Sequence, residues 1–358
     1  MNHFAKIAEK LSAYELDGML LTCEANRFYA SGFHSTGTDG VALVTREGNF
    51  YFTDSRYIEA AHNKVQDAEI AMTDAAHPYV DLINAAMEKT HVQKLGFEDA
   101  YMTVADYRHY SEKLHCQLVP ATELLISLRQ SKDEEEIQRM IAAQRIAEGA
   151  LDQIVKEIKP GVTEKEIAAR LQYLMLAGGA ENMSFDPIVA SGPNGSMPHA
   201  VPTDRKIQDG DFVTMDFGCI YQGYCSDMTR TVALGEPSAE MRRVYDTVLE
   251  AQRMGREALA PGKSCFEIDK LVRDYIDSQG YAGRFGHGLG HAVGIDIHEN
   301  PRLSTGCHDV VEVGHVLTVE PGIYIPGLGG VRIEDTCLVT ESGNDPLTGA
   351  APKELIIL

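Results

Sequence analysis

Three histidines, His287, His291 and His298, lie close together in the segment RFGHGLGHAVGIDIHENPR (284–302). The first two have the spacing of the zinc-binding helix motif H-E-x-x-H, but Gly288 stands where that motif needs its glutamate. Each glycine of the segment would cost about 1 kcal/mol relative to alanine in a helix interior, so we expect extended or turning chain. The alternating pattern HAVGIDIH indicates a strand from His291 to His298. Taken alone, the segment fits a loop with incidental histidines equally well.

The second part of the chain contains an internal similarity. The matched pairs, in order, are PGVTEKEIAARL (160–171) with PGKSCFEIDKLV (261–272), GDFVTMDFG (210–218) with GHVLTVEPG (314–322), and SDMTRTVAL (226–234) with IEDTCLVT (333–340). The last pair is the weakest, and the offsets of 101, 104 and 107 residues drift as small loop insertions would make them drift. We therefore expect two α/β halves related by pseudo-twofold symmetry. The alternative is chance recurrence of capping boxes and β-rich segments.

The repeat matches acidic residues to one another. Asp216 corresponds to Glu320, and Asp227 corresponds to Glu334. These acids lie among Val, Thr, Phe and Ile residues that should be buried, and a buried carboxylate must be paired or bind a cation. Two divalent cations would relieve the repulsion among four converging carboxylates and leave room for one imidazole ligand. Other histidines of the cluster would then act on a substrate.

The expected ligand set also suggests which metal ions bind and what they do. Oxygen ligands with a single nitrogen favour manganese, iron or cobalt over a structural zinc. Two such ions about 3.5–4 Å apart can share a bridging water and lower its pKa toward neutrality. The resulting hydroxide could attack a carbonyl group.

These motifs resemble those of the pita-bread metallopeptidases, which include methionine aminopeptidase, aminopeptidase P and prolidase. The resemblance covers residues from about 130 to the end, through HGLGHAVGIDIHE, TVEPG, VRIED and the two aspartates. It implies that Asp216 binds one metal ion and that Asp227 and Glu334 bridge both. It also implies that His291 and Glu320 complete the shell of the second ion. Glu320 would shuttle a proton between the nucleophilic water and the leaving amine.

The same resemblance implies roles on the substrate side of the site. His199 and His298 match histidines that contact the substrate and stabilise the tetrahedral oxyanion. His287 matches a residue close to the metal shell. Arg332 would orient Glu334 or pair with a neighbouring acid.

The first part of the chain reads as a separate, smaller α/β domain. We expect strands at 15–22, 39–45 and 49–55 and helices at 4–14 and 79–89. This part resembles the N-terminal domain of the aminopeptidase P, prolidase and creatinase branch, which methionine aminopeptidases generally lack. The expected domains are therefore 1–128, creatinase/prolidase-like, and 129–358, the pita-bread catalytic domain.

A long helix should open the second domain. The sequence SKDE from Ser131 reads as a capping box with Glu134 at the third helical position. Apolar residues continue at helical spacing as far as Ile158, and Pro160-Gly161 then ends the helix.

The resemblance implies an Xaa-Pro peptidase that cleaves the bond before proline in small peptides with proline in the second position. Arg302 resembles the arginine with which prolidases hold the terminal carboxylate of a dipeptide, which favours an Xaa-Pro dipeptidase; a surface arginine is the alternative. Aminopeptidase P acting on Xaa-Pro-Yaa peptides is the second candidate. A metal-free creatinase-like hydrolase and an inactive binding protein are remoter, because all five ligand positions are present. Two ions per chain are expected, with manganese first and cobalt, iron or zinc as alternatives.

Bulk properties restrict the partners and the compartment. A formal charge of −21 argues against nucleic acid and anionic membranes. No stretch approaches a membrane span, the chain start lacks a signal-peptide core, and seven scattered cysteines favour a reducing cytoplasm. The resemblance also implies a homodimer in which the neighbour's first domain closes the site. The Gly-rich loop 29–40 with His34 is a candidate for that contribution, and a plain surface loop is the alternative.

Overall fold

The computed structural model describes residues 2–358, and the chain divides into two compact units between Arg129 and Gln130. Unit 1 runs up to Arg129, and unit 2 runs from Gln130 to Leu358. All seven cysteines are free thiols. Among the described residues, no helix combines the length and apolar composition needed to cross a bilayer.

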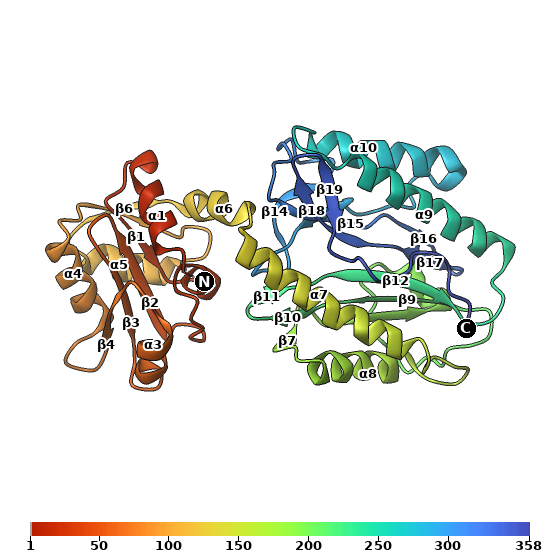
Figure 1. The fold of residues 1–358 in the computed structure, drawn as a ribbon, viewed down its shortest axis with the longest axis horizontal. Coiled ribbons are helices and arrows are strands. Elements are labelled where there is room, and N and C mark those ends of the chain that lie inside the picture. Colours follow the sequence, from red (N-terminus) through yellow and green to blue (C-terminus); the bar gives the residue numbers. More distant parts are fainter. Residues whose placement is uncertain (1) are drawn as a thin grey trace. The chain divides into compact units, whose positions relative to one another are not determined.

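Unit 1 is built on one mixed sheet. Its strands are β1 (Gly18–Leu21), β2 (Gly40–Thr45), β3 (Asn49–Thr53), β4 (Glu69–Met72), β5 (Lys94–Phe97) and β6 (Gln117–Pro120). They lie in the order β4-β3-β2-β1-β5-β6 (Figure 1). Every residue of β1 and β2 is buried, so both faces of the sheet are covered there, because alternate side chains point to opposite faces.

The helices of unit 1 connect and cover these strands. They are α1 (Phe4–Leu11), α2 (Glu24–Ser31), α3 (Ile58–Lys64), α4 (Tyr79–Lys89), α5 (Val104–Lys113) and α6 (Thr122–Gln130), with a 3₁₀ turn η1 (Ser12–Tyr14) after α1. The three predicted strands correspond to β1, β2 and β3, and the predicted helix at 79–89 is α4 with the same bounds. The helix predicted at 4–14 is α1 followed by η1.

Unit 2 contains two pairs of helices with antiparallel strands between them. The helices are α7 (Glu134–Ile154), α8 (Glu164–Ala177), α9 (Ala239–Ala258) and α10 (Cys265–Ile276), with the short turns η2 (Gly192–Ser196) and η3 (Asp277–Tyr281). The strands are β7 (Asn182–Met183), β8 (Ile188–Ser191), β9 (Phe212–Phe217), β10 (Cys219–Tyr221), β11 (Tyr224–Cys225), β12 (Met228–Ala233), β13 (Gly290–Ala292), β14 (Glu299–Leu303), β15 (Val316–Val319), β16 (Gly322–Ile325), β17 (Gly329–Arg332), β18 (Asp335–Thr340) and β19 (Gly343–Pro346). Figure 1 shows α7 and α8 on one side of the strands and α9 and α10 on the other.

The predicted repeat is present in unit 2. In the first half, α7 and α8 pack against β8, β9 and β12 through a core that includes Leu151, Leu171 and Met215. In the second half, α9 and α10 pack against β13 and β15 to β18 through a separate core that includes Val248 and Val272. β9 pairs antiparallel with β12, and β15 pairs antiparallel with β18, so the matched segments form matched strand pairs.

The predicted start of the long helix is wrong by two residues. The N-cap is Asp133, whose carboxylate accepts from the backbone N–H of Glu136 at 3.0 Å, while Glu136 accepts from the N–H of Asp133. Ser131 instead donates its hydroxyl to the carbonyl of Val313, and the N–H of Lys132 donates to Gly314. These contacts hold residues 131 and 132 outside the helix. At its other end, the helix stops at Ile154 rather than at the predicted Ile158.

The continuous strand predicted from His291 to His298 is also wrong. Strand β13 ends at Ala292, the chain bends, and β14 returns antiparallel beside it from Glu299. The bend closes around Glu299, whose Oε1 accepts from the N–H of Asp296 at 3.2 Å. A Cβ on Gly294 would lie 2.6 Å from the Glu299 carboxylate oxygens, so the Glu299 side chain would have to move to admit one.

Candidate functional site

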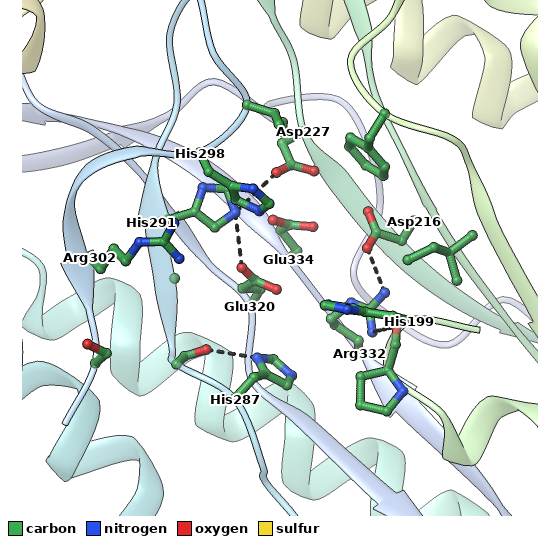
Figure 2. Close-up of a pocket in the computed structure, with 17 residues that line it drawn as sticks. His199, Asp216, Asp227, His287, His291, His298, Arg302, Glu320, Arg332 and Glu334 are labelled. Carbon is green, nitrogen blue, oxygen red and sulfur yellow. Dashed lines mark hydrogen bonds and ion pairs between the residues drawn. The ribbon is translucent and has the colours of Figure 1, made fainter. Parts of the chain in front are cut away.

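A cavity of about 550 Å³ lies in unit 2 and is lined by residues from both halves of the repeat (Figure 2). Its lining includes every site residue predicted from the sequence: His199, Asp216, Asp227, His287, His291, His298, Arg302, Glu320, Arg332 and Glu334. The fold therefore brings together side chains that are up to 135 residues apart in the chain. His34 belongs to unit 1, where its ring stacks on Phe28 with 3.8 Å between centroids.

The acidic residues lie at the ends of the matched strands. Asp216 is near the end of β9, where Thr229 of β12 is its cross-strand partner, and Asp227 directly precedes β12. Glu320 follows β15, and Glu334 lies between β17 and β18. Asp216, Asp227 and Glu334 each present an oxygen within 4.8 Å of the others. Because the halves face each other, four carboxylates meet in one cavity (Figure 2).

His291 points one ring nitrogen at these acids. Its Nε2 is 3.6 Å from Asp227 Oδ2 and 3.4 Å from Glu320 Oε1. Its Nδ1 lies 3.1 Å from the carbonyl oxygen of Ala292, a contact in which the N–H at Nδ1 donates. Burial lowers the pKa of His291 to about 3, so the ring is neutral and Nε2 keeps its lone pair. A neutral imidazole with a lone pair aimed at carboxylates is suited to ligating a cation.

The acids themselves are poorly stabilised as anions by the protein alone. Burial, followed by the charge of Asp216, raises the pKa of Asp227 well above its usual range. Burial, followed by the charge of Asp227, also raises the pKa of Glu334 well above its usual range. Burial raises the pKa of Glu320 to about 8. The Oδ1 atom of Asp216 is buried without a hydrogen-bond partner. Divalent cations among these groups would replace the missing partners, so the donor set fits a metal centre.

Arg332 supplies the strongest protein contact to the acid cluster. Its Nη2 donates to Asp216 Oδ2 at 2.6 Å, and its side chain is 3% exposed. The same guanidinium donates to the carbonyl of Pro198 and to the hydroxyl of Tyr324, each at about 3 Å. Arg332 therefore holds one oxygen of Asp216, while the other oxygen remains available to a cation.

Tyr324 is a site residue that the sequence analysis missed. Its hydroxyl lies 2.8 Å from His287 Nε2 and accepts from Arg332 at 3.0 Å. It follows Glu320 by four residues, but the repeat offers no signal for it, because the matched residue of the first half is Ile220. Burial, followed by the charge of Arg332, lowers the pKa of His287 to about 4. His287 is therefore neutral and linked to Arg332 through Tyr324.

Three further side chains stand around the acids at the open part of the cavity. His199 lies in the exposed loop after η2, and His298 packs edge-on against His291 with 4.5 Å between ring centroids. Arg302 on β14 is the cross-strand partner of His291. It is exposed, and although its charge opposes the burial that raises the pKa of Glu320, it lies in no ion pair with a carboxylate of residues 2–358. An anionic group of a ligand could therefore bind its guanidinium.

Apolar residues complete the lining, and the sequence had given no means of choosing them. They are Phe185, Ile188, Pro198 and Ile297. Ile188 is the cross-strand partner of Asp216, which places an apolar side chain directly beside the acid cluster. The cavity thus combines a charged floor with an apolar wall.

Metal binding at this site is expected to strengthen as the pH rises from 6 to 8. Carboxyl groups with raised pKa values, such as Glu320 at about 8, must lose their protons before they ligate a cation. Each displaced proton should strengthen Mn²⁺ binding by up to about tenfold per pH unit. In the metal-free protein the same ionisation costs stability as the pH rises, so the increase in Tm on adding Mn²⁺ should grow. Titration calorimetry and thermal melts across this pH range test the prediction, and an affinity independent of pH would contradict it.

Comparison with known proteins gives matches along nearly the whole chain. The profile of Metallopeptidase family M24 matches residues 138–341, and the profile of the Creatinase/Prolidase N-terminal domain matches residues 4–131. The Xaa-Pro dipeptidase of Pyrococcus furiosus is 36% identical over 350 residues, which is 96% of each chain. A solved structure of an Xaa-Pro dipeptidase from Bacillus anthracis has a TM-score of 0.94 and 42% identity over 99% of both chains. That of an X-Pro aminopeptidase from Thermotoga maritima MSB8 has a TM-score of 0.90 and 33% identity, covering 96% of this chain and 98% of the other.

Proposed function

Because this chain belongs to metallopeptidase family M24 and has its pita-bread fold, we propose that it is an Xaa-Pro dipeptidase. Membership of the family makes it a metal-dependent peptidase. The proposed substrate is a small peptide with proline in the second position, cleaved at the bond before proline. The names of two relatives, from Pyrococcus furiosus and Bacillus anthracis, support this choice.

We assign the metal ligands to the five side chains that meet at the floor of the cavity. Asp216 would hold one ion, His291 and Glu320 the other, and Asp227 and Glu334 would bridge the two. Two divalent ions, with manganese favoured by the oxygen-rich donor set, would supply Lewis-acid polarisation of the carbonyl and lower the pKa of a nucleophilic water. The close approach of the three carboxylates and the orientation of His291 Nε2 support the assignment.

Glu320 is the proposed proton carrier of the reaction. One of its oxygens would accept a proton from the attacking water and deliver it to the proline nitrogen as the peptide bond breaks. A carboxyl group whose pKa is raised toward neutrality is suited to both steps, and burial raises that of Glu320. His199 and His298 would donate hydrogen bonds to the carbonyl oxygen as negative charge develops on it.

Selectivity for proline would come from the apolar wall. The X–Pro bond is a tertiary amide without an N–H, so a site that offers no acceptor at that position accepts proline and leaves the donor of an ordinary amide unpaired. Phe185, Ile188 and Ile297 are the apolar side chains of the cavity that could contact the ring.

The observation that carries the choice of a dipeptidase is the position of Arg302. Its guanidinium is exposed beside His291, lines the cavity and has no carboxylate partner in the described chain. In an Xaa-Pro dipeptide, the terminal carboxylate lies one residue beyond the scissile bond and could form a bidentate pair with this side chain. The second candidate, an aminopeptidase P activity on longer peptides, is supported by the name of the relative from Thermotoga maritima.

Hydrolysis of Xaa-Pro is expected to exceed that of Xaa-Pro-Yaa when both are compared in manganese-supplemented buffer. The reason is that only the dipeptide carries its terminal carboxylate one residue beyond the scissile bond, where Arg302 could bind it. The measurement is kcat/KM for a matched pair of peptides with the same first residue. Faster cleavage of the longer peptide would favour the aminopeptidase P alternative, and no cleavage of either peptide would remove the proposed function.

We also propose that the protein works as a cytoplasmic homodimer. The free thiols support a reducing compartment, and the resemblance to the prolidase branch supports the dimer. The loop 29–40 with His34 is the candidate for a contribution to the neighbouring subunit. Light scattering coupled to size-exclusion chromatography tests the oligomeric state directly.

A further inference from the structure

Glu334 is held by the opposite half of the repeat rather than by its own. It lies between β17 and β18, and its carboxylate and its main chain both contact β12. The hydroxyl of Thr229 donates to Glu334 Oε2 at 2.7 Å, and the N–H of Glu334 donates to the carbonyl of Thr229 at 3.2 Å. The carbonyl of Glu334 accepts from Arg230 Nη1. Two adjacent residues of β12 thus fix Glu334 at its carboxylate, its N–H and its carbonyl.

Arg230 uses all of its donors in this arrangement. Besides Glu334, Nη1 donates to the carbonyl of Thr229 at 2.9 Å, and Nη2 donates to Asp335 Oδ1 at 2.9 Å. The remaining N–H groups donate to the carbonyls of Ala351 and Pro352. The side chain is 2% exposed. A guanidinium offers five donors in a rigid fork, so this set of acceptors could not be satisfied by lysine.

Thr229 is equally enclosed and sits between two charged groups of the site. It is completely buried, and its hydroxyl also accepts from Arg332 Nε at 3.2 Å. A donated hydrogen bond favours the ionised form of Glu334, while burial and Asp227 oppose that form. The hydrogen bond from Thr229 uses one lone pair of Oε2, so both oxygens of Glu334 keep a lone pair for a cation.

We propose that Thr229 and Arg230 are positioning residues, which set Glu334 opposite Asp227 so that the pair can share two metal ions. The proposal rests on the metal centre of the proposed function. The two carboxylates come from different halves, and each half packs its helices in its own core. Their separation therefore depends on direct contacts between the halves. The contacts of β12 with Glu334 hold one member of the pair, and the hydroxyl of Thr336 on β18 donates to the carbonyl of the other, Asp227, at 2.8 Å.

The main test is Thr229→Val compared with Thr231→Val. Both are nearly isosteric changes at buried positions on the same face of β12. Among residues 2–358, however, the hydroxyl of Thr231 forms hydrogen bonds only with Thr214 and the main chain of Arg332. Thr229→Val should weaken Mn²⁺ binding by roughly ten- to a hundredfold, as loss of a ligand-orienting bond typically does. Thr231→Val should leave both dissociation constants within about threefold of wild type. Titration calorimetry on the metal-free proteins gives the constants.

Kinetics separate positioning from a general loss of stability. At subsaturating Mn²⁺, Thr229→Val should lower kcat with little change in KM, and Thr229→Ser should restore it. Arg230→Lys should also weaken Mn²⁺ binding. Its control is Lys353→Met, which removes another cation from Asp335 without touching Glu334.

Equal Mn²⁺ affinities for Thr229→Val and Thr231→Val would overturn this inference while leaving the proposed function in place. Absence of Mn²⁺ binding by the wild-type protein would instead remove the proposed function and this inference together. If Arg230→Lys fails to fold, the threonine pair still decides the outcome.

Discussion

Asp227→Asn is expected to abolish useful turnover of Xaa-Pro substrates while the protein remains folded. The change removes the charge of a proposed bridging ligand from a position that is 4% exposed. Metal ions contribute several kcal/mol to stabilising the transition state. Since each 1.36 kcal/mol is a factor of ten in rate, kcat should fall by at least roughly a hundredfold. The measurement is steady-state hydrolysis at saturating Mn²⁺, with bound metal determined on the same samples.

The stability of this variant should change in a direction that ordinary loss of a side-chain contact would not produce. Burial raises the pKa of Asp227 in the folded state, so its ionisation above the unfolded pKa costs folding free energy in the metal-free protein. The Asp227→Asn protein in chelator should therefore melt no lower than wild type at pH 8. On addition of Mn²⁺, wild type should gain more in Tm than the variant. A variant that is no less stable than wild type in chelator but gains less Tm from Mn²⁺ identifies Asp227 as a metal ligand rather than a merely structural carboxylate.

Asp211→Asn is a matched control for Asp227→Asn. Asp211 directly precedes β9 and pairs with Arg205 at 2.6 Å, and it does not line the cavity. This change should lower Tm slightly and leave metal binding and kcat unchanged. Wild-type activity in Asp227→Asn would show that the ligand assignment is wrong.

Arg302→Ala is expected to weaken hydrolysis of Xaa-Pro dipeptides far more than that of longer peptides. A hydrogen bond to a charged group contributes roughly 1.5–3 kcal/mol, so kcat/KM for the dipeptide should fall about ten- to a hundredfold. The exposed position of Arg302 favours the lower part of that range, because solvent screens the charges. Xaa-Pro amides and Xaa-Pro-Yaa peptides lack a carboxylate at that point and should change little.

Arg284→Ala supplies the control for this experiment. Arg284 is also exposed and lies before β13, whereas Arg302 lies on β14, and Arg284 does not line the cavity. Arg284→Ala should leave kcat/KM unchanged for Xaa-Pro dipeptides, Xaa-Pro amides and Xaa-Pro-Yaa peptides. An equal loss on dipeptides and longer peptides in Arg302→Ala would remove the argument for a dipeptidase. Arg302→Lys, which keeps the charge without the planar fork, should recover only part of the dipeptide activity.

Much of the organisation could be predicted from local pattern. Short runs of apolar and aromatic residues predicted β1, β2 and β3, and apolar residues at helical spacing predicted α4. The matched segments predicted the two similar halves of unit 2, because duplicated units keep their buried residues at equivalent positions. Acids such as Asp216 and Glu320 stood out because a carboxylate in an otherwise apolar segment needs a partner that the segment itself cannot supply.

Errors arose where distant contacts override local preference. Ser131 has the spacing of an N-cap, but its hydroxyl is taken by Val313, so Asp133 caps the helix. The segment after His291 alternates like a strand, yet it bends around Glu299 at Gly294. In both cases a partner far away in sequence, or a close approach of a side chain to the backbone, competes with the pattern.

The sequence by itself determined the residue types of this site: four acids in matched positions, a cluster of histidines and two arginines, Arg302 and Arg332. Only the tertiary structure decided how they are held. It placed Tyr324 between His287 and Arg332, paired Arg332 with Asp216, and used β12 of one half to fix Glu334 of the other. The physical reason is that a hydrogen bond requires two groups at a set distance and angle, and no periodicity within either segment specifies the position of its partner.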